Sequence, residues 1–145
     1  MDFDSAMKIS GSGLTANRAW MNTVSSNLAN MNANKTETGL PYQRKTIICE
    51  SQPASQSFDD VMSDALNGGI EKVSVEGVVP DGRDFKRTFD PSNPDADKDG
   101  YVLSPNINNV EEMANMLTAS QSYEANLAAL NTAKSLALKT LDIAK

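Results

Sequence analysis

The fold is decided by residues 106–145, which read NINNVEEMANMLTASQSYEANLAALNTAKSLALKTLDIAK. This segment follows Pro105 and contains no glycine or proline. Residues spaced alternately three and four positions apart lie on one face of a helix. This spacing recurs along the segment and predicts a single long helix with one inward stripe. The predicted stripe comprises Met113, Met116, Ser120, Tyr123, Leu127, Leu130, Lys134, Ala137, Leu141 and Ala144. We expect Asn108 or Asn109 to cap the helix, because asparagine side chains accept hydrogen bonds from the first free amides.

The other face of this helix is almost uncharged. Between Met113 and Ala133 the only charged residue is Glu124, and the remainder is mostly Ala, Ser, Thr, Asn and Gln. A helix exposed to water normally carries lysine and glutamate on its outer face. At 1.5 Å per residue the helix would be roughly 55 Å long, too long to be covered by a small domain. We therefore expect other backbones to approach it on several sides.

A second helix of the same kind is predicted from Phe3 to about Asn32. Its stripe again alternates in steps of four and three, and from Ile9 to Asn34 the only charged residue is Arg18. Gly11 and Gly13 predict a bend or break, because each weakens a helix by roughly 1 kcal/mol relative to alanine. The stripe comprises Phe3, Met7, Ser10, Leu14, Asn17, Met21, Val24, Leu28 and Met31. Neither helix has enough apolar surface to be stable alone, so we expect neighbouring chains to order both; an isolated two-helix monomer is the less favoured alternative.

The middle of the chain predicts a small β module. A strand is expected at 43–49, a short helix at 57–66, and an antiparallel hairpin from strands at 70–78 and 85–89 around Pro80-Asp81-Gly82. Residues 90–105 are expected to form a proline-fixed loop. The predicted fold class is mainly α with this small β module, with the two terminal helices packed as a coiled-coil-like pair. The predicted divisions are an N-terminal axial helix (1–34), a middle module (35–105) and a C-terminal axial helix (106–145).

Composition excludes several classes of function. The 145 residues include 13 Lys and Arg against 19 Asp and Glu, a net charge of -6, which disfavours nucleic acids and anionic membranes as partners. No apolar run is long enough to span a bilayer, and the acidic start Met1-Asp2-Phe3-Asp4 is not that of a cleaved signal peptide. The absence of histidine removes the commonest general base and metal ligand. The single Cys49 is expected to be a half-buried strand residue.

Acidic residues give two further hypotheses. Asp95, Asp97, Asp99 and Gly100 match the first half of a calcium loop, but the twelfth position is Asn106 where a bidentate glutamate is needed. A turn with exposed carboxylates is the favoured interpretation, and we expect no metal, cofactor or catalytic residues. Neighbouring pairs such as Glu111 and Glu112 should point apart on a helix, so they predict a solvated face instead of an acid–base pair.

Both ends of the chain and the Pro/Asp loop resemble the proximal rod proteins of the bacterial flagellar basal body, of the FlgC type, within the wider rod and hook axial family. The resemblance covers nearly the whole chain and is weakest at 51–79. It is carried by Ser10–Ala16, Ser26–Asn30, Gly39–Lys45, Asp90–Asp97, Asp99–Val102, Pro105–Asn106, Glu112–Met113 and Tyr123–Asn126.

The resemblance implies a structural protein and not an enzyme. Members stack helically into the hollow rod that carries motor torque across the periplasm. They leave the cytoplasm through the flagellar type III export apparatus without a cleaved signal peptide. Implied partners are further copies, other rod subunits, the export-gate adaptor and the distal rod. The expected subunit-interface residues are Leu14, Trp20, Met21, Val24, Asn27, Leu28, Asn30, Met113, Leu117, Tyr123, Asn126, Leu127, Leu130 and Leu141, of which roughly half are expected to serve within the subunit.

Three alternatives remain. Another rod or hook subunit is disfavoured because distal rod and hook members carry a longer middle. A calcium-binding interaction module depends on the Asp loop alone. An enzyme has no supporting motif in the sequence.

Overall fold

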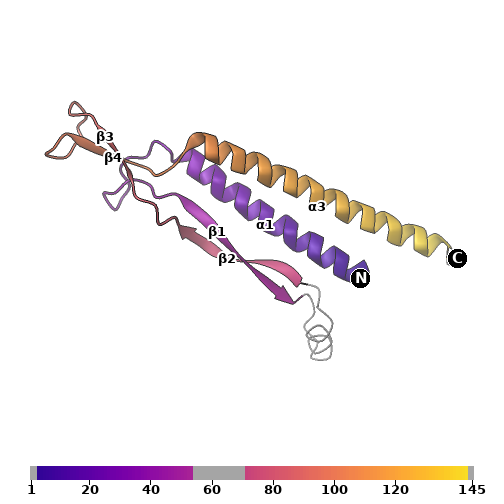
Figure 1. Ribbon diagram of the computed structural model, residues 1–145. Coiled ribbons are helices and arrows are strands. Elements are labelled where there is room, and N and C mark those ends of the chain that lie inside the picture. Colours follow the sequence, from indigo (N-terminus) through magenta and orange to yellow (C-terminus); the bar gives the residue numbers. More distant parts are fainter. Residues whose placement is uncertain (1–2, 54–70, 144–145) are drawn as a thin grey trace. The chain divides into compact units, whose positions relative to one another are not determined.

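A computed structural model describes residues 3–53 and 71–143 of the chain (Figure 1). The elements are helix α1 (Phe3–Ala29), strands β1 (Lys45–Pro53), β2 (Glu71–Pro80), β3 (Lys86–Phe89) and β4 (Tyr101–Ser104), and helix α3 (Asn109–Ile143). Both predicted terminal helices are confirmed. The short helix predicted at 57–66 lies outside the described residues. No helix in the described part of the chain combines the length and hydropathy needed to cross a bilayer.

The predicted break in the first helix is wrong, because α1 is continuous through Gly11 and Gly13. Near the two glycines, side-chain hydroxyls donate hydrogen bonds to backbone carbonyls of the preceding turn. Ser12 Oγ donates to the Ile9 carbonyl at 2.8 Å, and Thr15 Oγ1 donates to the Gly11 carbonyl at 3.1 Å. Gly13 also has a packing role, since a Cβ at this position would lie 2.8 Å from Asn126 Nδ2. A Cβ added at Gly11 would have no neighbouring atom within 4 Å.

The β pairing also differs from the prediction. Strand β2 does not turn back onto β3; β1 pairs with β2, and β3 pairs with β4. The second pair is antiparallel, with Lys86 opposite Ser104 and Phe89 opposite Tyr101. At the end of β2 the Asp81 amide donates to the Arg44 carbonyl at 2.7 Å, so Asp81 stays bonded to the residue before β1 and β2 is not turned onto β3 at Pro80-Asp81-Gly82. Strand β4 lies inside the segment predicted to be wholly loop.

The chain divides into two compact units. Unit 1 contains Met1–Ala19, Ile48–Gly77 and Thr118–Lys145, and unit 2 contains Trp20–Ile47 and Val78–Leu117. In unit 1 the first half of α1 packs on the second half of α3 where Gly13 meets Asn126, and the Val73 amide of β2 donates to Ser12 Oγ at 3.2 Å. Ala16 and Ala119, at 7% and 0% exposure, are the buried apolar side chains of this unit among those described.

Small side chains and a few polar groups make up the rest of the interior. In unit 2 the buried apolar side chains of the described part include Val24, at 1% exposure, and Val102, at 4%. Thr23, Asn27 and Glu112 are buried with them. A core this small, with a carboxylate inside it, depends on polar pairing more than most domains do.

Candidate functional site

Glu112 is the centre of a polar cluster in unit 2. Its side chain is fully buried, contrary to the prediction that Glu111 and Glu112 form a solvated face. Oε1 accepts hydrogen bonds from Arg44 Nε at 2.8 Å and from Asn115 Nδ2 at 3.3 Å. Arg44 Nη2 forms an ion pair with the same oxygen at 2.8 Å. Oε2 accepts from Asn27 Nδ2 at 2.9 Å. A charge buried with this many donors is compensated within its own chain.

The Asn27 side chain connects α1 to the start of β1 by bonding both backbone groups of Lys45, as the backbone of a neighbouring strand would. Its Oδ1 accepts from the Lys45 amide at 2.9 Å, and its Nδ2 donates to the Lys45 carbonyl at 2.8 Å. Tyr42 Oη also donates to Asn27 Oδ1 at 3.3 Å. The amide side chain thus satisfies both backbone groups of one residue, which fixes where β1 leaves the helix.

The same cluster extends to the segment after β2 and to the approach to α3. Arg44 Nη1 donates to Asp81 Oδ2 at 3.0 Å, and the Arg44 amide donates to Asn106 Oδ1 at 2.8 Å. Arg83 Nε donates to Asp81 Oδ2 at 2.8 Å, and Arg83 Nη1 donates to Glu111 Oε2 at 3.3 Å. Every described buried side-chain nitrogen or oxygen has a hydrogen-bond partner. The cluster therefore joins α1, β1, the β2 end and α3 without an orphaned polar group.

Two pKa values in the cluster follow from these bonds. Burial acts to raise the pKa of Asp81, but the hydrogen bonds from the Arg83 amide and from the Arg83 and Arg44 guanidiniums outweigh it, so the pKa lies below its usual value. The hydrogen bond to Glu111, followed by that to Asp81, raises the pKa of Arg83. Each shift favours the charged form, as expected of groups that hold segments together.

The predicted interface residues divide by exposure. Val24 and Asn27, at 1% and 0%, are buried inside their own chain. Asn30 is half-buried and donates through Nδ2 to the Ser26 carbonyl at 2.8 Å, and Asn126 lies against Gly13. The structure also leaves half-buried Leu14, Trp20, Met21, Leu28, Tyr123 and Leu130. The exposed members are Met113 (59%), Leu117 (60%), Leu127 (39%) and Leu141 (63%), all on α3.

The inward face of α3 is not quite the predicted stripe. The less exposed positions are Glu112, Met116, Ala119, Tyr123, Asn126, Leu130, Ala133 and Ala137, again in steps of four and three. Three exposed apolar residues were missed by the sequence analysis: Val110 at 75%, Leu136 at 60% and Leu138 at 54%. They lie off the predicted stripe, on a face made mostly of small residues. A large apolar side chain on that face was the signal in the sequence that could have identified them.

Among the described residues of unit 1, no helix runs beside the end of α3. Gly13 lies against Asn126, and the two helices run in opposite directions (Figure 1). Phe3, the first residue of α1, is ten residues before Gly13, and the position ten residues after Asn126 is Leu136. Since both helices rise equally per residue, α3 continues past the start of α1 as far as Ile143. Leu138 and Leu141 lie on this continued end, and Leu136 lies level with Phe3.

The Asp-rich loop is built as a set of turns. Asp97 Oδ1 accepts from the amides of Asp99 and Tyr101, both at 2.9 Å, and Asp97 Oδ2 lies 3.6 Å from Arg87 Nη2. Asp95 pairs with Lys35 at 3.5 Å. No group of three His, Cys, Asp or Glu side chains that could hold a metal ion is found among the described residues. Cys49 lies on β1 as predicted, but it is exposed instead of half-buried.

Comparison with known proteins agrees with this structure of long terminal helices. The family model described as "Flagella basal body rod protein" matches residues 7–34, and that described as "Flagellar basal body rod FlgEFG protein C-terminal" matches residues 98–143. These two matches cover α1 and α3 almost completely, and they define the class as flagellar axial rod proteins.

Curated relatives match over nearly the full length. The flagellar basal-body rod protein FlgC of Aquifex aeolicus is 41% identical, covering 98% of this chain and 97% of the relative. The FlgC protein of Bacillus subtilis is 35% identical, covering 97% of this chain and 97% of the relative. That of Salmonella typhimurium is 38% identical, covering 93% of this chain and 92% of the relative. The chain belongs to the FlgC family of flagellar basal-body rod proteins.

Proposed function

We propose that this chain is a structural subunit of the flagellar rod that assembles with other rod subunits into the hollow drive shaft across the periplasm. The near-complete match to the FlgC proteins carries the proposal. The charge-poor helices and the exposed apolar side chains of α3 support it, because a surface of this kind is costly in water and is removed from water by association. The calcium-binding alternative is not favoured, since Asp95 and Asp97 already serve turns and ion pairs.

In this proposal α1 and α3 form a coiled-coil-like pair, and residues 1–34 and 106–145 contribute the axial helices. Residues 35–105 form the middle module between them. The polar cluster around Glu112 supports the division, because it ties both helices to the start of β1. The exposed members of the predicted set, Met113, Leu117, Leu127 and Leu141, contact neighbouring subunits. The half-buried members contribute partly to each subunit's own packing.

Export is the other part of the proposal. The chain passes through the flagellar type III export apparatus without a cleaved signal peptide and meets the export-gate adaptor and the distal rod as neighbours. Few apolar residues are buried in the part of the chain that the structure describes, which supports this route because little hydrophobic free energy opposes unfolding before export.

The test is complementation of a bacterium that lacks the corresponding gene. Leu117→Asp and Leu127→Asp should leave secretion intact but abolish rods and swimming, since each places a charge where a neighbour must pack. Thr38→Asp, in the exposed loop after α1, is the control and should swim normally. Normal swimming of both leucine variants would overturn the proposed assembly surface, whereas a failure of secretion alone would point to export.

A further inference from the structure

Unit 2 is made of two segments that are separated in the sequence and carry opposite net charge. The first is Trp20–Ile47 and the second is Val78–Leu117. The first segment contains three cations and one acid, which gives it a net charge of +2. The second contains eight acids and four cations, a net charge of -4. Attraction between the segments therefore favours the closed unit.

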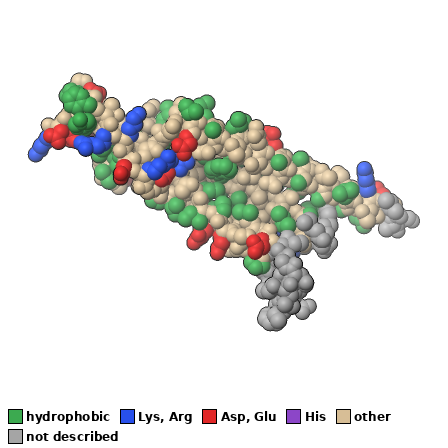
Figure 2. Space-filling view, viewed as in Figure 1, with side chains coloured by type: hydrophobic (Ala, Val, Ile, Leu, Met, Phe, Trp, Pro, Cys, Tyr) green, Lys and Arg blue, Asp and Glu red, His purple; other side chains and the backbone are tan. Residues whose placement is uncertain are grey.

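The ion pairs of the described residues follow this division. Each pair that joins the two segments takes its cation from the first segment and its acid from the second. Arg44 Nη1 lies 3.0 Å from Asp81 Oδ2, and Lys35 Nζ lies 3.5 Å from Asp95 Oδ1. Figure 2 shows basic and acidic side chains intermixed over the part of the chain that carries β3 and β4.

Glu112 differs from the other acids of the second segment that pair with the first, because it is fully buried. Its side chain is 0% exposed, whereas those of Asp81 and Glu111 are 17% and 41% exposed. Its carboxylate enters the first segment between Asn27 and Arg44, 2.9 Å from Asn27 Nδ2 and 2.8 Å from Arg44 Nε. Burial of these groups is costly unless all of them are paired. The closed unit therefore requires the carboxylate to be in place.

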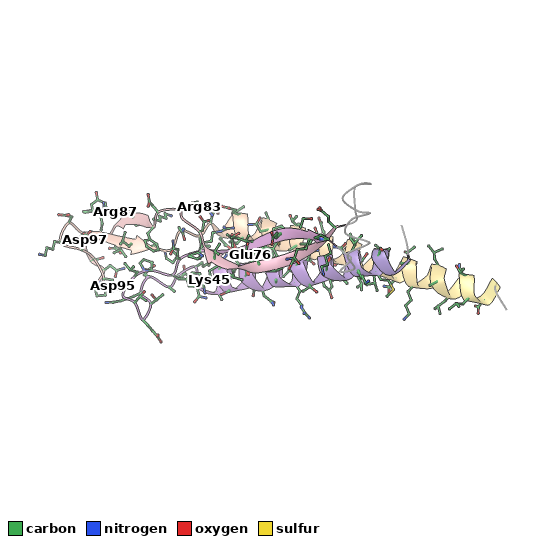
Figure 3. All side chains as sticks on the ribbon, turned by 90° about the horizontal axis from the view of Figure 1, so that it is seen from below. Lys45, Glu76, Arg83, Arg87, Asp95 and Asp97 are labelled. Atoms are coloured by element: carbon green, nitrogen blue, oxygen red, sulfur yellow. The ribbon has the colours of Figure 1, made fainter. Side chains whose placement is uncertain are left out.

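Backbone hydrogen bonds at the same place depend on the two segments being joined. The Arg44 amide donates to Asn106 Oδ1 at 2.8 Å, and the Asp81 amide donates to the Arg44 carbonyl at 2.7 Å. The Lys45 amide donates at 2.9 Å to Oδ1 of Asn27, the side chain that also holds Glu112. Lys45 lies at this point, at the start of β1 (Figure 3). We call the amides of Arg44, Lys45 and Asp81 the reporter amides.

Hydrophobic burial adds little to these polar contacts. Each segment contributes one buried valine, Val24 from the first and Val102 from the second. Polar pairing therefore decides whether the unit is closed. Unit 1 shares none of these bonds, and its two helices meet where Gly13 lies against Asn126.

We propose that docking of Glu112 between Asn27 and Arg44 is the step that closes unit 2. Without the carboxylate the two segments part and Trp20–Ile47 opens locally, while unit 1 stays folded. We call this arrangement the Glu112 latch. It makes the order of the first segment depend on a residue 68 positions after Arg44.

The latch has a use in export, and this part of the inference rests on the proposed function. A channel that admits one extended chain keeps the two segments apart, because residues 48–77 lie between them. Unit 2 therefore closes only after both segments have left the channel, whichever end of the chain leaves first. The chain stays open while it is exported and becomes ordered at its destination.

The experiment is amide hydrogen exchange, followed by NMR, on the purified full-length chain. Glu112→Ala is compared with Glu124→Ala, which removes an exposed carboxylate from the same helix and makes the same change in net charge. The three reporter amides should exchange about tenfold faster or more in Glu112→Ala, because local opening exposes them to water. In Glu124→Ala their exchange should change by no more than about twofold.

Unit 1 provides the internal control. The amides of Ala16 and Ala119, which are buried there, should exchange at unchanged rates in both variants. Unchanged exchange of the reporter amides in Glu112→Ala would overturn the proposal. Equal acceleration in unit 1 would overturn it too, because the chain then opens as a whole. If Glu112→Ala does not fold, Glu112→Gln, which keeps the side-chain volume, decides by the same criteria.

The latch and the proposed function can fail separately. Secretion and swimming of Leu117→Asp and Leu127→Asp test the proposed function. If the chain is not exported, the latch stands and only its use in export fails. If the exchange experiment fails, the assignment to the rod is unaffected.

Discussion

Removal of the Arg44 guanidinium should cost this chain a large part of its stability. Arg44→Met removes a hydrogen bond of 2.8 Å and an ion-pair contact of 2.8 Å from the Glu112 carboxylate, whose side chain is fully buried. The remaining donors to that carboxylate are Asn27 and Asn115. Breaking a buried ion pair on one side costs about 3–5 kcal/mol, because the other charge is left uncompensated. A small domain is stable by only about 5–15 kcal/mol, so the loss should be obvious.

The assay is urea unfolding of the purified chain, followed by far-UV circular dichroism. Lys35→Met is the matched control, because it removes a cation from an exposed pair with Asp95, with side chains 66% and 44% exposed. That change should cost no more than about 1 kcal/mol. Arg44→Lys should fall between the two, since it keeps the charge but not the fork of donors.

A double variant separates the buried charge from general damage. Arg44→Met with Glu112→Met removes both charges, so it should recover at least half of the lost stability. A loss below about 1 kcal/mol for Arg44→Met would refute the reasoning, because it is the value of a solvent-exposed pair. A double variant less stable than Arg44→Met would refute it equally.

Three further predictions concern the helices and pH. Asn108 Oδ1 accepts a hydrogen bond from the Val110 amide at 3.1 Å, so Asn108→Ala should lower the free energy of unfolding by about 1 kcal/mol in the same urea assay. The control, Asn109→Ala at the neighbouring position, should change the free energy of unfolding by less than half as much. Gly11→Ala should raise the thermal midpoint through a gain of up to about 1 kcal/mol, whereas Gly13→Ala should lose that gain because its Cβ meets Asn126; equal midpoints would contradict this packing. The pKa of Asp81 is lowered in the folded chain, so its contribution is present above the unfolded pKa of about 3.9 and is lost as pH falls through the folded value. Stability measured from pH 5 downward should therefore fall less steeply in Asp81→Asn than in the unmodified chain.

The terminal helices could be predicted from the sequence because they are set by local periodicity. The alternating spacing predicts both helices, and Asn108 at the predicted cap position is confirmed. The scarcity of charged residues in both helices, which is visible in the sequence alone, indicates association with other chains. The motifs at both ends indicate the flagellar rod family, which the comparisons confirm.

What could not be predicted depends on residues far apart in the chain. Glu112 looks like half of a solvated pair until Arg44, 68 positions away, is brought against it. The turn signal at Pro80-Asp81-Gly82 did not predict the pairing, because β2 pairs with β1 and the Asp81 amide still bonds the Arg44 carbonyl, 37 positions away. Strand β4 has only four residues after a proline-rich loop, too few for a pattern to show. The exposure of Leu136 and Leu138 depends on where α1 begins along α3, which periodicity alone does not give.

The central claim is that the exposed apolar side chains of α3 are covered by neighbouring subunits in the rod. Hydroxyl-radical labelling tests it directly, by comparing Met113, Leu117, Leu136 and Leu141 in the dilute chain and in isolated basal bodies. These residues should be labelled freely in the dilute chain and should be strongly protected in the rod. Equal labelling in both states would contradict the account.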